Sequence, residues 1–327
     1  FNEKLDTELI SGYKKLIFSN YELNERLFEY YENNNFDGFK YRESKFNKDV
    51  SVLPLSLTHL TFGYAFNQDV FNLPLSLTHL TFGYCFNKDV SVLPPFLIHL
   101  TFGSRFNQVV SVLPPFLTHL TFGFYFNQDV SNLPHVLTHL TFCYSFNQDV
   151  FKLPSTLTHL TFGHDFNQDV SVLPPFLIHL TFGTHFNKDV SKLPQGITHL
   201  TFGYNFNQDV SKLPQGITHL AFGSYFNQDI SNLPPSITHL TLRWKFNQQC
   251  NIPSNIKYLK LDCNNSHIIN YLPNSIIELE LSYNFNLEIN NLPTSIKKLV
   301  INKYSSYNED LNCLPDFIEE LHLSINY

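Results

Sequence analysis

Ten histidines recur at a fixed interval of 20 residues, and their imidazoles are the side chains of this sequence best suited to chemistry. A neutral imidazole binds zinc or copper, and its pKa lies close enough to neutrality for proton transfer. A metal site, however, needs three or four ligands that converge on one point, whereas a linear column offers two neighbours. We therefore predict no metal site and no cofactor. These residues, named here the His column, are His59, His79, His99, His119, His139, His159, His179, His199, His219 and His239.

Carboxylates recur near these histidines, at Asp69 and its copies, but they do not indicate an enzyme. Every repeat has the same groups in the same geometry, whereas an active site needs one asymmetric cluster. The sequence also lacks a phosphate-binding glycine loop and a nucleophile elbow. The cysteines are odd in number and have no metal-ligand spacing, which is typical of reduced thiols in an intracellular protein. They are Cys85, Cys143, Cys250, Cys263 and Cys313.

The repeat that spaces the histidines also predicts the fold. Leu-Pro recurs every 20 residues from Pro54 to Pro234 and continues with small slips to Pro315. A typical unit, residues 66–83, ends in Leu-x-x-Leu-x-Phe-Gly, whose alternation of apolar and polar residues is that of a half-buried strand. Proline in every repeat leaves little room for helices. We expect one short parallel strand in each coil and turns elsewhere.

The repeats account for nearly the whole chain. Ten regular repeats occupy residues 46–245, and four drifted repeats with a C-terminal cap occupy residues 246–327. Residues 1–45 form either two degenerate coils or a helical cap, because apolar residues there fit both spacings. The two coils would centre on Tyr13/Leu16/Phe18 and Phe36/Phe39/Tyr41. The total is about 16 coils of about 20 residues.

Positions within the repeat predict core and surface. If Leu60 and Phe62 point inward, His59 and Thr61 point outward and form two columns on the sheet face. Asn67 and its copies follow a core Phe, and we expect their buried amides to form an asparagine ladder along the stack. Gly63 and its copies end the strand through a positive φ or a close backbone approach. The predicted interior comprises Leu57, Leu60, Phe62, Phe66, Val70, Leu73 and their copies.

The pattern Phe-Asn-x-x-(x)-Leu-Pro-x-x-Leu-x-x-Leu-x-Phe-Gly resembles the FNIP-repeat proteins, relatives of leucine-rich repeats found in social amoebae and in giant viruses of amoebae. The resemblance is strong over residues 46–245, although the family unit is usually nearer about 22 residues and has Ile before the Pro. It implies an all-β-leaning solenoid, a leucine-rich-repeat-like right-handed superhelix. Proteins of this family commonly have an N-terminal F-box and are taken to be substrate adaptors of ubiquitin ligases. Residues 1–45 contain no recognisable F-box.

Two interpretations of the His and Thr columns stay open. In the first, repeat duplication copied an outward-facing His and Thr that have no binding role and only hydrogen-bond along the sheet. In the second, the columns form a face that binds a ligand or partner. A flat Thr array that binds ice is a further interpretation, which is disfavoured because the second column consists of His. Beside the columns, the two residues after each strand-ending Gly vary and are rich in aromatics. These rings either merely cover the turn or form a recognition strip, since exposed aromatics are favoured contact residues. This aromatic strip comprises Tyr64, Tyr84, Phe124, Tyr125, Tyr144, Tyr204, Tyr225 and Trp244.

Composition narrows the class of partner. The chain has 21 Lys and Arg against 28 Asp and Glu, so affinity for nucleic acid is not expected. It has no apolar stretch of about 18 residues, so no membrane partner is expected either. Met is absent, so we expect the natural start to lie upstream of Phe1.

These observations predict a non-enzymatic scaffold with a protein partner, in the cytoplasm of the host cell or in a virion. The alternative is a structural protein that assembles with itself, because the regular repeats have few charges to oppose association.

Overall fold

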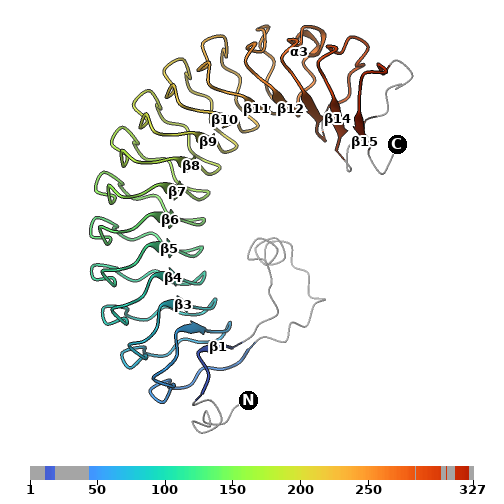
Figure 1. Ribbon diagram of the computed structural model, residues 1–327. Coiled ribbons are helices and arrows are strands. Elements are labelled where there is room, and N and C mark those ends of the chain that lie inside the picture. The colour runs from blue at the N-terminus through green and yellow to red at the C-terminus, as the bar shows by residue number, and fades with distance from the viewer. Residues whose placement is uncertain (1–11, 19–43, 284, 303–306, 308–313, 324–327) are drawn as a thin grey trace. The chain divides into compact units, whose positions relative to one another are not determined.

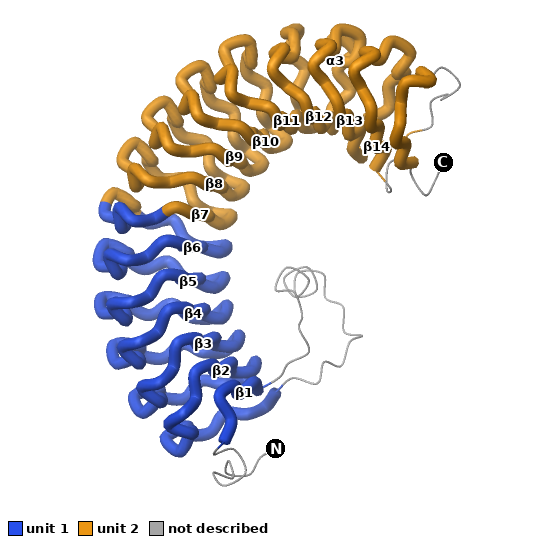
Figure 2. Tube along the Cα trace, viewed as in Figure 1, with its two compact units in different colours: residues 1–148, 152–157 blue, residues 149–151, 158–327 orange. Residues whose placement is uncertain are grey.

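The computed structural model describes residues 12–18, 44–283, 285–302, 307 and 314–323. The chain divides into two compact units (Figure 2). The first comprises residues 1–148 and 152–157, and the second comprises residues 149–151 and 158–327. The boundary between the units falls among the regular repeats. The division of the chain after residues 45 and 245 stays a prediction.

The described part of the first unit contains a parallel sheet in which each strand pairs with the next along the chain (Figure 1). Equivalent residues of successive repeats face each other, as His59 faces His79 and Thr61 faces Thr81. The register is therefore set by the repeat length. The strands are β1 (Lys15–Ile17), β2 (His59–Thr61), β3 (His79–Thr81), β4 (His99–Thr101), β5 (His119–Thr121) and β6 (His139–Thr141).

The second unit continues the same design among its described residues, with one short helix, α3 (Ser266–Asn270), between two of its strands. Its strands lengthen from three residues to four at β11, where Leu242 joins the strand and faces Leu261. They are β7 (His159–Thr161), β8 (His179–Thr181), β9 (His199–Thr201), β10 (His219–Ala221), β11 (His239–Leu242), β12 (Tyr258–Leu261), β13 (Glu278–Leu281), β14 (Lys298–Ile301) and β15 (Glu320–His322).

Turns close each coil on both sides of its strand. The amide of Leu77 donates to the carbonyl of Pro74 at 3.1 Å, and the amide of Phe86 donates to the carbonyl of Gly83 at 3.3 Å. Both bonds span three residues, as in β-turns, and they recur in the neighbouring coils. The prediction of one parallel strand per coil with turns between is confirmed.

Two layers of phenylalanine fill the interior. Phe62 and Phe66 stack within one coil at 3.7 Å between ring centroids, and each stacks on its copy in the next coil, at 5.6 Å for Phe62 and Phe82. Leu57, Leu60 and their copies complete a core that is almost wholly inaccessible to solvent. The interior predicted from the sequence is confirmed, and repeated burial of large aromatic side chains is its main stabilising contribution.

Glycine ends the strands because the coils approach each other closely there. A Cβ built on Gly83 would lie 2.1 Å from the carbonyl oxygen of Gly63, and one on Gly103 would lie 2.0 Å from that of Gly83. The φ angles of these glycines are outside the left-handed region. Of the two reasons predicted for these glycines, close backbone approach is therefore the correct one.

The terminal coils differ from the prediction in two ways. The strand beside β2 is β1, with Lys15 opposite His59, so the sheet position assigned to Phe36/Phe39/Tyr41 belongs to Lys15–Ile17. Residues 36–41 themselves, and most of the alternative helical cap, lie outside the described residues. The structure has 15 strands in its described part against about 16 predicted coils.

The helix α3 was not predicted either. The side chain of Asn265 caps the N-terminus of this helix by accepting a hydrogen bond from the amide of Ile268. Among the described coils, this drifted repeat alone has such a helix cap. Among the described residues, no helix has the length and apolar character needed to cross a bilayer.

Candidate functional site

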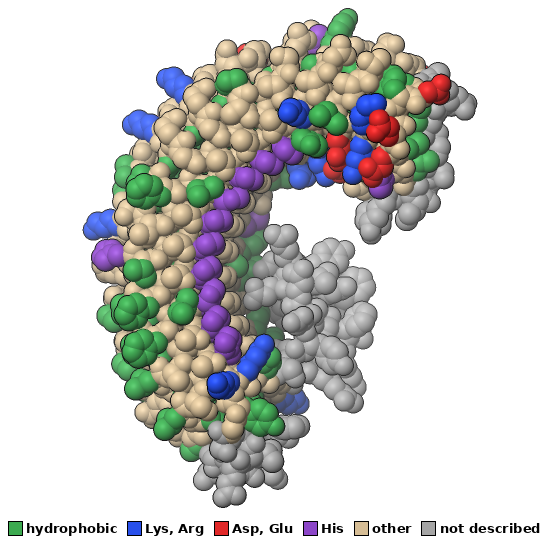
Figure 3. Space-filling model, in the orientation of Figure 1, with side chains coloured by type: hydrophobic (Ala, Val, Ile, Leu, Met, Phe, Trp, Pro, Cys, Tyr) green, Lys and Arg blue, Asp and Glu red, His purple; other side chains and the backbone are tan. Residues whose placement is uncertain are grey.

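The His column is a stack of parallel, half-exposed imidazole rings in each unit. In the first unit, the rings from His59 to His139 follow one another at 4.1–4.4 Å between centroids. In the second unit, those from His159 to His239 do so at 3.8–4.4 Å, and Tyr258 extends the stack at 4.1 Å. Figure 3 shows His side chains in purple, one beside the next on the surface of each unit. Alternation along each strand places them outward, because the Leu that follows each His is buried.

Threonines that precede the histidines hold the imidazoles in place. The hydroxyl of Thr78 lies 2.9 Å from Nδ1 of His79 and 3.1 Å from the carbonyl oxygen of Thr58. A carbonyl can only accept, so the Thr hydroxyl donates to it and must itself accept from Nδ1–H. The proton of the neutral imidazole therefore sits on Nδ1, and Nε2 keeps its lone pair as a hydrogen-bond acceptor.

The same arrangement recurs at Thr58, Thr118, Thr138, Thr198, Thr218 and Thr238. At two places an Ile replaces this Thr, and the stack is still regular. These are Ile98 before His99 and Ile178 before His179.

Packing and charge favour the neutral form of the column. Partial burial lowers the pKa of His79, and the neighbouring imidazoles of His59 and His99 lower it further. The same two causes lower the pKa of His199 and His219, in the same order. A column of neutral imidazoles presents ring edges with acceptor nitrogens and no net charge.

The character of this row changes after Tyr258. Glu278, Lys298 and Glu320 follow in register, and Lys298 Nζ lies 3.9 Å from the carboxylate of Glu278 and 3.4 Å from that of Glu320. In the neighbouring row, Lys260 and Glu280 form an ion pair at 2.6 Å. The face over β12–β15 is thus charged, whereas that over β7–β11 is neutral.

The aromatic strip forms small clusters. Tyr64 stacks on Tyr84 at 4.7 Å, and Phe124 stacks on Tyr144 at 4.3 Å while contacting Tyr125 edge to face. The more exposed members are Tyr125, Tyr204, Tyr225 and Trp244.

Cations accompany two of these clusters. The guanidinium of Arg105 lies over the ring of Tyr84 at 5.3 Å. Lys245 Nζ lies 4.5 Å from the ring centroid of Tyr225 and 5.3 Å from that of Trp244, and Tyr225 in turn packs against Tyr204. Such cation and ring contacts hold the strip's side chains against the coils.

Two other columns have structural roles. The carboxylate of Asp89 accepts from the amide and the hydroxyl of Ser91, which lowers its pKa, and six regular repeats share this turn. The asparagine ladder is confirmed: Oδ1 of Asn107 accepts from the amide of Asn127 at 2.9 Å and from Gln128 at 3.1 Å. Its amides are half-exposed or exposed, so the prediction of buried amides is wrong.

A cluster that sequence reasoning missed joins His164, Asp165 and His185. Oδ1 of Asp165 lies 2.7 Å from Nδ1 of His164 and 3.3 Å from Nδ1 of His185. The three ligand atoms lie within 4.8 Å of one another. The signal was present in the sequence, because a 20-residue repeat places residue 185 directly beside residue 165. The prediction of no metal site considered the His column and the cysteines alone.

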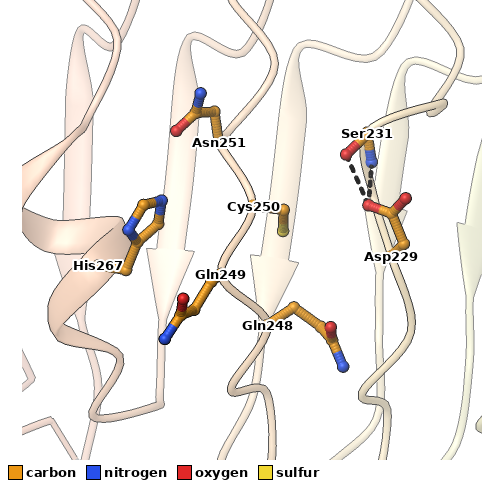
Figure 4. A pocket seen from close by; sticks show the side chains of 7 residues that line it. All are labelled: Asp229, Ser231, Gln248, Gln249, Cys250, Asn251 and His267. Carbon is orange, nitrogen blue, oxygen red and sulfur yellow. Dashed lines mark hydrogen bonds between the residues drawn. The ribbon is translucent and has the colours of Figure 1, made fainter.

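The second unit also has a surface pocket near α3 (Figure 4). Burial raises the pKa of the Cys250 thiol, and hydrogen bonds from Ser231 lower that of the Asp229 carboxyl. A thiol with a raised pKa is a poor nucleophile, so the pocket contains no activated Cys. The pocket is lined by Asp229, Ser231, Gln248, Gln249, Cys250, Asn251 and His267.

Comparison with known proteins agrees with this architecture. The FNIP Repeat model matches the chain in nine segments that together cover residues 46–185 and 209–284, well over half of it. The solved structure of CroV588, a circular leucine-rich-repeat protein of a giant virus, is 40% identical, with a TM-score of 0.67. The match covers 85% of this chain and 48% of that one, so the chain spans about half the length of CroV588.

The functional domain of InlJ from Listeria monocytogenes shares the fold at 17% identity, with a TM-score of 0.51, over 74% of this chain and 61% of that one. The comparison with curated proteins found no match. The repeat scaffold is of the leucine-rich-repeat kind, whose solenoids present extended surfaces for contact with other molecules. The nine repeat matches and the 40% identity to CroV588 together show that this chain belongs to the FNIP-repeat family.

Proposed function

We propose that the protein is a non-enzymatic scaffold that binds a protein partner through the His column, with the aromatic strip as a second contact. The observation that carries this proposal is the stack of half-exposed imidazoles, held by the Thr hydroxyls and by one another. Side chains that are already ordered lose little conformational entropy on binding. Their ring edges and Nε2 acceptors suit a partner that offers apolar groups and hydrogen-bond donors.

The charge of the second unit supports a protein partner rather than a polyanion. Burial and a neighbouring imidazole bias His219 towards neutrality, and the row Glu278, Lys298, Glu320 alternates acidic and basic side chains. A partner with its own alternating charges could pair with Glu278, Lys298 and Glu320, which would fix its register on the face. A nucleic acid would need a basic surface, and this face does not supply one.

Within this class, the family resemblance suggests a substrate adaptor of a ubiquitin ligase. That specific role rests on the resemblance alone, and we propose it as the first one to test. Self-assembly is the alternative, and the same experiment separates the two.

The test compares three forms of the chain as bait in an extract of the host cell. One replaces three column residues (His199→Asn, His219→Asn and His239→Asn), and its control replaces two exposed lysines of another column (Lys192→Gln and Lys212→Gln). A partner that the wild type and the control retain, and that the column variant loses, supports the proposal. Equal retention by all three forms overturns the assignment of the face. Growth of particle mass with concentration in light scattering, with no partner retained, makes the protein its own partner and overturns the adaptor role.

A further inference from the structure

We propose that His164, Asp165 and His185 bind one divalent transition-metal ion, of which Zn²⁺ is the type. This inference is independent of the proposed partner face. Two imidazoles and a carboxylate are a ligand set of intermediate softness, which suits Zn²⁺, Cu²⁺, Ni²⁺ or Co²⁺. Mg²⁺ and Ca²⁺ prefer sites made wholly of oxygen ligands, so the set discriminates against them.

The backbone fixes the spacing of the three residues. His164 and Asp165 are the two variable residues that follow strand β7, and His185 lies one repeat further on. The amide of His185 donates to the carbonyl of His164 at 2.8 Å, a bond between coils that recurs at this position, as from Asn205 to Thr184. The backbone at the site thus has the same bond between coils as other repeats, so the adjustment needed to bind a metal falls on the side chains.

Ring orientation separates this cluster from the His column. In the column, neighbouring rings are nearly parallel, with 11–24° between the planes of the described pairs, so their nitrogens point in parallel directions. The rings of His164 and His185 are 63° apart, with centroids 4.2 Å from each other. Both turn Nδ1 towards the same carboxylate oxygen. This convergence on one point is what a metal site requires and what the column lacks.

The distances fit a metal after a small adjustment. Bonds of about 2.0–2.2 Å in a tetrahedral site place ligand atoms roughly 3.3–3.6 Å apart. The separation of 3.3 Å between Asp165 Oδ1 and His185 Nδ1 already has this value, whereas the 2.7 Å separation from His164 Nδ1 must widen. All three side chains are partly exposed, at 28%, 35% and 48%, so they are able to rotate.

The proton balance is simple. Without metal, the carboxylate can only accept, so each Nδ1 in contact with it carries a proton. On binding, an imidazole that is neutral moves this proton to Nε2 and gives its Nδ1 lone pair to the ion, whereas an imidazole that is protonated on both nitrogens releases one proton. Three protein ligands leave a fourth position for water or for an exogenous ligand.

The other repeats of the second unit do not reproduce the set. The matching pairs there are Tyr204/Asn205, Ser224/Tyr225 and Trp244/Lys245, none of which combines imidazole with carboxylate. The cluster is therefore a local departure from the repeat, at positions where the solenoid itself does not restrict residue type.

Calorimetric titration of the full chain with Zn²⁺ near neutral pH tests the site. We expect one tight Zn²⁺ site per chain. The affinity for Zn²⁺ should fall by about tenfold to a hundredfold or more in Asp165→Asn and in His185→Gln, because replacing even a residue that only hydrogen-bonds to a metal ligand has an effect of that size. The controls are His135→Gln, an exposed His outside the cluster, and His219→Gln in the column, and both should keep the tight site. Weak binding spread over many sites, or equal losses in His219→Gln and His185→Gln, overturns the proposal.

A second measurement does not depend on variants. In a spectrum of the wild-type imidazole nitrogens, one equivalent of Zn²⁺ should shift the Nδ1 signals of His164 and His185 and leave the column unchanged. Shifts centred on the column instead would show that the cluster is not the site.

Discussion

The imidazole rings of His219 and His239 lie 3.8 Å apart between centroids, with 17° between their planes, the shortest such distance among the described pairs of the His column. Burial lowers the pKa of both, and a charge on His239 lowers that of His219 further. Protonation of one ring therefore disfavours protonation of the next. The folded rings therefore stay neutral to a lower pH than unfolded histidines do, and this difference links the protonation of the surface to the stability of the fold.

Acidification should destabilise the protein before any carboxylate titrates. Unfolded histidines bind protons at about pH 6.5, whereas burial lowers the pKa of five folded column members, which therefore bind protons at lower pH. These five are His79, His99, His199, His219 and His239. Stability is therefore complete above about pH 6.5 and falls as the pH drops through and below that value. Thermal unfolding followed by circular dichroism from about pH 7.5 to about pH 5 measures this. The variant with His199→Gln, His219→Gln and His239→Gln should show a shallower decline, and an unchanged melting temperature in the wild type contradicts the prediction.

The proton of His219 should reside on Nδ1. The hydroxyl of Thr218 lies 2.9 Å from that nitrogen and donates to the carbonyl of Thr198, so it can only accept from the ring. Nitrogen chemical shifts of the imidazole distinguish the tautomers directly. Replacing Thr218→Val should remove the preference and lower stability by about 0.5–1.5 kcal/mol, the usual net value of one hydrogen bond. His99, which follows Ile98, is the internal control and should show no such preference in the wild type.

A methyl group should be tolerated at one glycine and not at another. In Gly83→Ala the new Cβ meets the Gly63 carbonyl oxygen at 2.1 Å, and the coils must separate, at a loss of at least about 1–3 kcal/mol. In Gly216→Ala the nearest atom is 3.4 Å away and φ is ordinary, so the change should be neutral or stabilise by up to about 1 kcal/mol. Urea unfolding of the two variants compares them, and equal stabilities would show that the coils separate without cost.

Much of this architecture is predictable from the repeat because the same residues satisfy the same contacts in every coil. Leu-Pro and the strand motif locate β2–β11, and alternation about Leu60 and its copies places the histidines outward. Features that occur once are harder to predict. Lys15 pairs with His59 although the two residues are much further apart in the sequence than the 20 residues that separate paired positions in the regular repeats, so the repeat period does not predict this pairing. The helix α3 depends on one cap at Asn265.

The candidate site was predictable in position and not in chemistry. The His column and the aromatic strip follow from the period. The Thr hydroxyl beside most of the rings donates to a carbonyl of the preceding coil, and this bond between coils becomes evident only in three dimensions. The cluster at Asp165 was missed because the two variable positions after each strand were considered only for their aromatic side chains. The amides of the ladder are half-exposed or exposed, because the turn that follows each core Phe lies at the surface even where Oδ1 accepts from the amide of the next coil.

The asparagine ladder should stabilise the solenoid through its acceptors rather than through packing. Oδ1 of Asn107 serves both the amide of Asn127 and the side chain of Gln128, so Asn107→Ala leaves a backbone donor without its protein acceptor. We expect a loss of about 1–3 kcal/mol in urea unfolding, towards the lower end because water reaches the half-exposed turn. Asn107→Asp keeps an acceptor oxygen and should lose less. If Asn107→Asp lowers the free energy of unfolding as much as Asn107→Ala does, the side-chain amide donors stabilise the ladder and the Oδ1 acceptor does not.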